Sequence, residues 1–151
     1  MIITFCGHRN VTGRDKVSEK VYEVLKGLDK NEQIDFYLGE YGDFDRIARK
    51  CCEKYKKEIN SSVKLYFVTP YLDDMYLKNR YNEEDFDGII YPEIENVPFK
   101  YAILKRNFWM ADQADMIIAC VNNTWGGASN MLRYALRRDK NCINLGNYGL
   151  I

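Results

Sequence analysis

Residues 116–138 read MIIACVNNTWGGASNMLRYALRR, and this stretch decides the fold. The uncharged apolar run Met116–Val121 predicts a buried strand. A polar turn follows, and Gly126-Gly127 opens a helix in which Met131, Leu132, Ala135 and Leu136 are expected to face inward. A fully apolar strand followed at once by an amphipathic helix is typical of a parallel sheet that carries helices on its faces.

The rest of the chain repeats this alternation of strand and helix. Apolar runs predict further strands at 2–6, 34–38, 63–68, 88–91 and 142–145. Helical spacing of apolar residues lies at 17–28, 44–55 and 99–110. Strands separated by single helices imply right-handed parallel crossovers. We therefore expect one α/β domain over residues 1–151, a Rossmann-like, doubly wound and mainly parallel sheet with helices on both faces.

The composition limits what the chain does. With 151 residues, 46% of them hydrophobic, the chain has enough apolar surface for a continuous core. The 22 basic and 22 acidic residues cancel, which argues against nucleic acid as a partner, although a small basic pocket is compatible with neutrality. No apolar run approaches the roughly 18 residues of a membrane span, and the N-terminus lacks the basic lead of a signal peptide. We expect no membrane contact and a cytoplasmic location.

The cysteines indicate reduced thiols and not a disulfide framework. Their number is odd, and no C-x-x-C pair occurs among Cys6, Cys51, Cys52, Cys120 and Cys142. His8 is the only histidine, so a zinc site would need thiolates from distant parts of the sequence. The sequence predicts no metal site and no cofactor.

Three of the expected strands end in small or polar residues, at the sheet edge where ligands bind in such folds. The three segments are GHRN at 7–10, GEYGDFD at 39–45 and NNTWGGASN at 122–130. In the third segment the glycine pair gives an anion close access to the free N–H groups of a helix start. The alternative is that the two glycines only let the helix pack against the strand.

Two arginines favour the anion. Arg9 directly follows a strand, and Arg106 shares an apolar helix face with Ala102 and Met110. A buried guanidinium must find an anion or strand-end carbonyls, because an unpaired buried charge is very costly. The leading hypothesis is that Arg106 and the amides at 126–127 meet at one anion. A structural ion pair to Asp112 or Asp115 is the alternative.

Further polar and aromatic residues complete the candidate site. His8 is either a general acid or phosphate donor, or a hydrogen-bonding loop residue. Trp125 either stacks on a base or packs at the edge of the core, and Glu40 is placed to contact ribose hydroxyls. Arg106, Glu40 and His8 are also the candidates for catalysis. The expected ligand-binding set is Gly7, His8, Arg9, Gly39, Glu40, Arg106, Asn107, Trp125, Gly126, Gly127, Ala128, Ser129 and Asn130.

Taken together, the segments 4–9, 105–112 and 125–128 and the turn at Gly39 resemble the short YpsA-like branch of the SLOG superfamily. That superfamily joins the Lonely Guy phosphoribohydrolases to the DNA-processing proteins of natural transformation. The resemblance covers nearly the whole chain. It implies a Rossmann-like fold, a nucleotide or nucleotide-derived ligand at the strand ends, and a homo-oligomer.

The resemblance also carries over single residues. Arg106 and Met110 match the R-x-x-x-M element of the hydrolases, and Gly126-Gly127 match the glycines of P-G-G-x-G-T-x-x-E that hold phosphate. Arg133 stands where the hydrolases have their catalytic glutamate, and an arginine cannot act as a base. Turnover of the ligand is therefore not obligatory.

The leading expectation from the resemblance is a sensor or sequestering protein for a phosphorylated nucleotide or a nucleotide-derived molecule, of the ADP-ribose or cyclic-nucleotide class. The alternative is an N-glycoside hydrolase that acts on nucleoside monophosphates. A weaker alternative is a single-stranded nucleic-acid binding module. Gly39 and Asp45 match the G-G-A-x-G-x-D element of the DNA-processing branch, but Glu40, Tyr41 and Asp43 depart from it.

Overall fold

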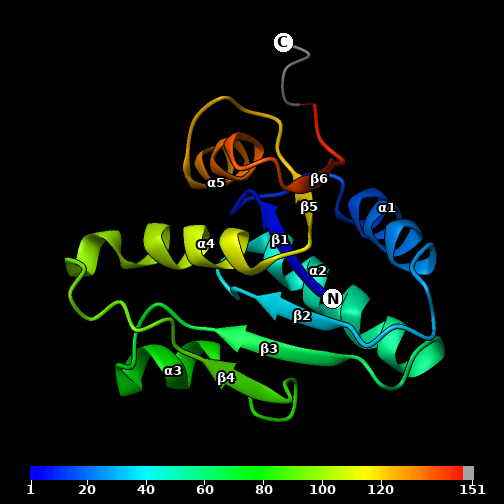
Figure 1. Ribbon diagram of the computed structural model, residues 1–151, viewed down its shortest axis with the longest axis horizontal. Helices are drawn as coiled ribbons and strands as arrows, with labels where there is room; N and C mark the ends of the chain where they lie inside the picture. The colour runs from blue at the N-terminus through cyan, green and yellow to red at the C-terminus, as the bar shows by residue number, and fades with distance from the viewer. Residues whose placement is uncertain (148–151) are drawn as a thin grey trace.

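A six-stranded sheet in which every pairing is parallel runs through the protein (Figure 1). The computed structural model describes residues 1–147. The strands are β1 (Ile2–Gly7), β2 (Asp35–Leu38), β3 (Lys64–Val68), β4 (Gly88–Ile90), β5 (Met116–Cys120) and β6 (Asn141–Asn144). They lie in the order β4-β3-β2-β1-β5-β6, so the chain builds outward from β1 to one edge and then crosses back to fill the other. The expected α/β Rossmann-like sheet is confirmed.

Helices cover both faces of this sheet and bury two separate cores (Figure 1). On one face, α1 (Arg14–Lys26) packs against α2 (Asp43–Glu58), and on the other α4 (Ala102–Gln113) packs against α5 (Gly127–Arg137). The 3₁₀ turn η1 (Phe99–Tyr101) leads into α4, and the short helix α3 (Asp74–Arg80) lies in the connection between β3 and β4. The helices α4 and α5 therefore lie together on one face, and the loop that leads into α5 starts at the carboxyl end of β5.

The strand pattern explains the two cores, because successive residues of a strand point to opposite faces. Phe5 of β1 packs into the core under α1 and α2, whereas the neighbouring Cys6 packs into the core under α4 and α5. Leu136 departs from the expectation that it faces inward, since 48% of its side chain is exposed near the end of α5. All five cysteines are free thiols, four of them buried and Cys142 half-buried.

None of the helices among residues 1–147 combines the length and the apolar character that crossing a membrane requires.

Candidate functional site

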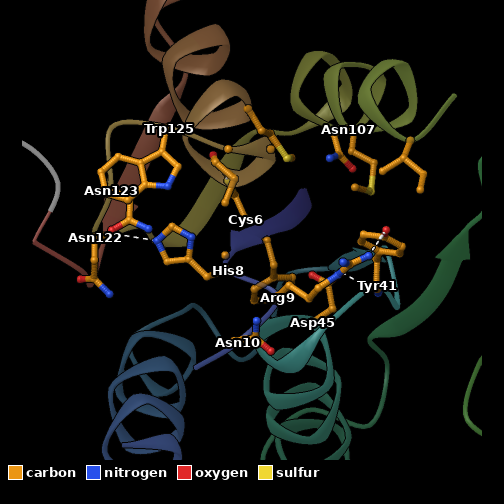
Figure 2. A pocket seen from close by; sticks show the side chains of 18 of the residues that line it. Cys6, His8, Arg9, Asn10, Tyr41, Asp45, Asn107, Asn122, Asn123 and Trp125 are labelled. Atoms are coloured by element: carbon orange, nitrogen blue, oxygen red, sulfur yellow. Dashed lines mark hydrogen bonds between the residues drawn. The ribbon is translucent and has the colours of Figure 1, made fainter. Parts of the chain in front are cut away.

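A cavity of about 620 Å³ opens at the carboxyl ends of β1 and β5. These neighbouring strands mark the point where the strand order reverses, which is where ligands bind in open α/β sheets. The cavity wall comes from the loops after β1, β2 and β5, from one side of α4 and from the start of α5 (Figure 2). Of the expected site residues, those that line it are Gly7, His8, Arg9, Arg106, Asn107, Trp125, Gly126, Gly127 and Ala128.

The start of α5 presents open backbone N–H groups at this cavity. Gly126 has φ +94°, a conformation that side-chain-bearing residues rarely adopt, and no side chain among residues 1–147 caps the helix. A Cβ atom on Gly126 or on Gly127 would meet nothing within 4 Å, so the space in front of the helix start is free. Backbone donors and the helix dipole together make such a terminus attractive to an anion.

Trp125 lies at the mouth of the cavity with 68% of its surface exposed. The core-edge alternative for this residue is therefore wrong. Trp109 behaves in the opposite way, because it stacks against Tyr37 with ring centroids 5.8 Å apart and an interplanar angle of 3°. Figure 2 shows the Trp125 ring on the same side of the cavity as His8 and Asn123. Its free face offers an apolar platform to a ligand ring.

One ring nitrogen of His8 is hydrogen-bonded within the protein. Its Nε2 accepts a hydrogen bond from the Asn122 backbone N–H at 2.8 Å, shown as a dashed line in Figure 2. Burial lowers the pKa of His8, which favours the neutral imidazole that this hydrogen bond requires. The geometry matches the hydrogen-bonding loop residue that the sequence offered as one of two readings.

Arg9 leaves β1 on the other side of the cavity and is exposed. It donates a hydrogen bond to the Tyr41 hydroxyl, and its Cζ lies 4.7 Å from the centroid of the Tyr41 ring. Arg9 forms no ion pair with any carboxylate of residues 1–147. Its charge is therefore free for a ligand.

The contacts of Arg106 differ from the central expectation about the site. Only 1% of it is exposed, and its Nη1 donates to the carbonyl oxygens of Gly39 at 3.0 Å and Val68 at 2.7 Å. The expected meeting of Arg106 with the 126–127 amides is thus replaced by hydrogen bonds to the ends of β2 and β3. A Cβ on Gly39 would lie 3.2 Å from the guanidinium carbon, so the glycine makes room for this side chain.

The expected ion-pair alternative for Arg106 is also wrong. Asp112 accepts a hydrogen bond from Tyr134, and Asp115 accepts one from the backbone N–H of Ile2. The carboxylate that acts on Arg106 is Asp45: burial lowers the pKa of Arg106, and the Asp45 charge opposes that effect. In turn, burial raises the pKa of Asp45, and the Arg106 charge opposes that shift. Both side chains line the cavity.

Four expected site residues do not line the cavity, because other contacts hold them. Gly39 packs against Arg106, and Glu40 accepts a hydrogen bond from Arg49 Nε at 2.6 Å. Burial raises the pKa of Glu40, and the Arg49 charge opposes the rise.

The other two residues belong to the start of α5. Ser129 donates to the Gly126 carbonyl at 3.1 Å. Asn130 accepts from Arg133, which also donates to the Thr124 carbonyl and so braces the loop before α5.

The cavity also contains residues that were not in the expected set. Asn10, Asn122 and Asn123 lie two or three residues beyond the ends of β1 and β5, and that position was the signal that could have selected them. Tyr41 and Asp45 come from the loop after β2 and the first turn of α2. The sequence places this segment at the same edge of the sheet, but spacing alone does not show that these two side chains reach the cavity.

Taken as a class, the fold defines a Rossmann-like α/β protein, with a cavity at the carboxyl ends of its strands. Among the solved structures with this fold is the X-ray structure of DNA processing protein A from Streptococcus pneumoniae, with a TM-score of 0.67 and 14% identity over 94% of this chain and 49% of that one. Another is DNA processing protein A from Helicobacter pylori, described for its single-stranded DNA binding mode, with a TM-score of 0.67 and 19% identity over 95% of this chain and 64% of that one.

The present chain therefore spans about half to two thirds of the length of these two structures. No protein-family model and no curated protein sequence matches it. At 14% and 19% identity the similarity establishes the fold. It gives no support to the YpsA-like branch in particular, and the expected homo-oligomer stays a prediction.

These findings overturn the leading functional expectation. A sensor or sequestering site for a small nucleotide-derived molecule rested on Arg106 and the 126–127 amides sharing an anion, and Arg106 is instead bound to strand-end carbonyls. The structures that share the fold are DNA-processing proteins, one of them described as binding single-stranded DNA. The expectation that nucleic acid is not a partner is contradicted by the same structures, since a net charge of zero does not describe the charge of any one part of the surface.

Proposed function

We propose that this protein binds single-stranded DNA at the carboxyl ends of β1 and β5, as a member of the superfamily that includes the DNA-processing proteins. One observation carries the proposal: the exposed Trp125 directly precedes the uncapped start of α5. A surface for a base and a site for a phosphate thus lie side by side, as they do in a nucleotide chain. The DNA-processing proteins that share the fold support the same assignment.

The chemistry of this arrangement suits an unpaired strand. Stacking of a base on an aromatic side chain contributes about 1–3 kcal/mol and tolerates any sequence, since every base has a π face. That face is accessible only when the base is not stacked in a duplex. The phosphate would bind the N–H groups at Gly126 and Gly127, and Arg9 would neutralise a neighbouring charge.

The neutral composition is compatible with this function, because the acidic residues near this edge are held by other cations. Asp43 pairs with Arg14 and Arg46, and Glu40 pairs with Arg49. Asp45 accepts a hydrogen bond from the Tyr41 backbone N–H and faces Arg106. The positive charge of Arg9 is therefore not cancelled locally.

Fluorescence polarisation with a labelled oligothymidylate of about 12 nucleotides tests the proposal. The wild-type protein should bind the single strand and prefer it to a duplex of the same length. Its affinity should fall with salt, with a slope of about −0.7 in log–log form for each phosphate contact. A Trp125→Ala variant should lose about ten-fold or more in affinity.

Tyr101→Ala is the matched control, because Tyr101 is an exposed aromatic residue that does not line the cavity. It should bind DNA like the wild type. Absence of binding by the wild type, an affinity that is flat with salt, or equal losses in the two variants would each overturn the proposal. Thymidine monophosphate should compete only weakly, since it lacks the adjoining phosphates.

A further inference from the structure

Two guanidinium groups share the ring of Tyr41, next to the cavity. The Arg9 Cζ lies 4.7 Å from the ring centroid, and the Arg80 Cζ lies 5.3 Å from the same centroid. The two charges are therefore no more than about 10 Å apart. Arg80 is the last residue of α3, so it comes from the connection between β3 and β4 and not from the strand ends that form the cavity.

This pair of like charges has no counter-ion among residues 1–147. Neither Arg9 nor Arg80 forms an ion pair with a carboxylate of the described chain. Asp45, the neighbouring carboxylate, is turned to the Tyr41 backbone N–H and to Arg106. Two cations held close together repel each other, and an anion that binds both guanidinium groups at the edge of the Tyr41 ring offsets that repulsion.

A buried hydroxyl at the same place lacks a partner. The Tyr76 hydroxyl is shielded from solvent and has no hydrogen bond within the described residues, while the Arg80 Cζ lies 5.7 Å from the Tyr76 ring. Tyr71 packs edge-on against Tyr76 with ring centroids 4.9 Å apart. Buried polar atoms in protein interiors are almost always paired, so an unpaired hydroxyl on a ring next to the uncompensated Arg80 is consistent with a binding site here.

We propose that Arg9 and Arg80, held across Tyr41, bind a second phosphodiester of the DNA strand whose first phosphate lies at α5. This inference rests on the proposed function and extends it, because it gives the strand a direction across the protein surface, from Trp125 over Tyr41 toward α3. The planar guanidinium group donates two parallel hydrogen bonds to a phosphate, which an ammonium group does not.

An Arg80→Gln variant tests the second subsite, with Lys78→Gln as the matched control. Lys78 lies in the same last turn of α3, carries the same charge and is exposed. In Arg80→Gln, affinity for the oligothymidylate should fall about ten-fold, and the salt slope should become shallower by about 0.7. Lys78→Gln should keep the wild-type affinity and slope.

Quenching of tryptophan fluorescence separates this inference from the function on which it rests. Saturating oligothymidylate should quench the Arg80→Gln variant as fully as the wild type, because the base still stacks on Trp125. If Arg80→Gln matches Lys78→Gln in affinity and slope, the second subsite is wrong and the first is unaffected. If the wild type itself neither binds nor quenches, the proposed function fails, and this inference fails with it.

Discussion

The helices α2 and α5 both begin at the carboxyl edge of the sheet, and both follow a glycine. They differ in whether the N–H groups of the first turn have hydrogen-bond partners within the protein. At α2 the N–H groups of Asp43 and Phe44 donate to the carbonyls of Arg9 and His8, at 2.8 and 3.4 Å. The Asp43 carboxylate also accepts from the Val11 N–H at 3.0 Å. At α5 no side chain of residues 1–147 caps the helix, and the space before Gly126 and Gly127 is free.

The difference distinguishes a helix start whose N–H groups are satisfied by the protein from one whose N–H groups are available to a ligand. The loop after β1 closes over α2, and Asp43 supplies the negative charge that a helix start favours. The start of α5 favours a negative charge in the same way, and none of the side chains described up to residue 147 supplies one. The variants below either break this contrast or make it sharper.

The largest effect should come from Arg106→Met. This change removes the hydrogen bonds by which Arg106 joins α4 to the ends of β2 and β3. The change leaves the Gly39 and Val68 carbonyls without their donor and Asp45 without its counter-charge. Leaving a buried acceptor without its hydrogen-bond donor costs about 1–3 kcal/mol for each acceptor. Urea denaturation should show a loss of this size, whereas Met at the adjacent exposed Lys105 should cost little. A loss of less than about 1 kcal/mol in the free energy of unfolding would mean that Arg106 is not needed to hold the ends of β2 and β3 against α4.

A second variant gives α5 the internal anion that α2 already has. Gly127→Glu places a carboxylate at the start of α5, and Gly127→Gln is its uncharged control of the same size. Because the new charge occupies or repels the anion position, DNA affinity should be about ten-fold lower for Glu than for Gln. The helix dipole should meanwhile make the Glu variant more stable by about 0.3–1 kcal/mol. Equal affinities would show that the DNA phosphate does not bind at this helix start.

A third variant removes the charge at α2. The Val11 N–H, and then Arg14 and Arg46, lower the pKa of Asp43 below its usual value of 3.8. A carboxylate with a lowered pKa stabilises the fold above its unfolded pKa, and that stabilisation disappears as the pH falls through the folded pKa. Asp43→Asn should therefore lower the melting temperature at pH 7 and flatten its fall in acid.

DNA affinity should be unchanged in Asp43→Asn, since Asp43 does not line the cavity. A loss of DNA binding comparable to that of Gly127→Glu would mean that the two helix starts do not have separate roles.

The smallest effect concerns His8, which links the loop after β1 to the loop after β5 by accepting a hydrogen bond from the Asn122 N–H. Burial lowers the pKa of His8 below 6.5, so the unfolded chain binds its proton more readily than the folded one. Stability should then decline as the pH falls below about 6.5 and level off below the folded pKa. A His8→Gln variant should lack this decline in a series of melting temperatures from pH 7.5 to about 5. An identical pH profile in the two proteins would contradict the assignment.

Periodicity explains why the fold could be predicted from the sequence. The run Met116–Val121 and the amphipathic segment after Gly126 carry the period of their own elements, and the parallel order follows from single-helix crossovers. The position of the cavity follows in turn from the strand ends. These features depend on local pattern, which a single sequence contains.

The partners of individual side chains could not be predicted in the same way. The sequence shows that a buried Arg106 needs acceptors but not that the carbonyls of Gly39 and Val68 provide them. Nothing in the spacing shows that Arg80 reaches Tyr41 from a different connection, or that Trp125 faces solvent. Net charge likewise does not show which surface groups pair and which charges remain free.

The hydrogen bonds from Arg106 to two strand ends also bear on how fast and how tightly a ligand is taken up. They link α4 to β2 and β3 through the interior, so folding itself sets the shape of the cavity floor. A preorganised receptor loses little conformational entropy when it is occupied. Association should then be limited by diffusion and orientation and not by a slow rearrangement, and the free and occupied proteins should have nearly the same backbone.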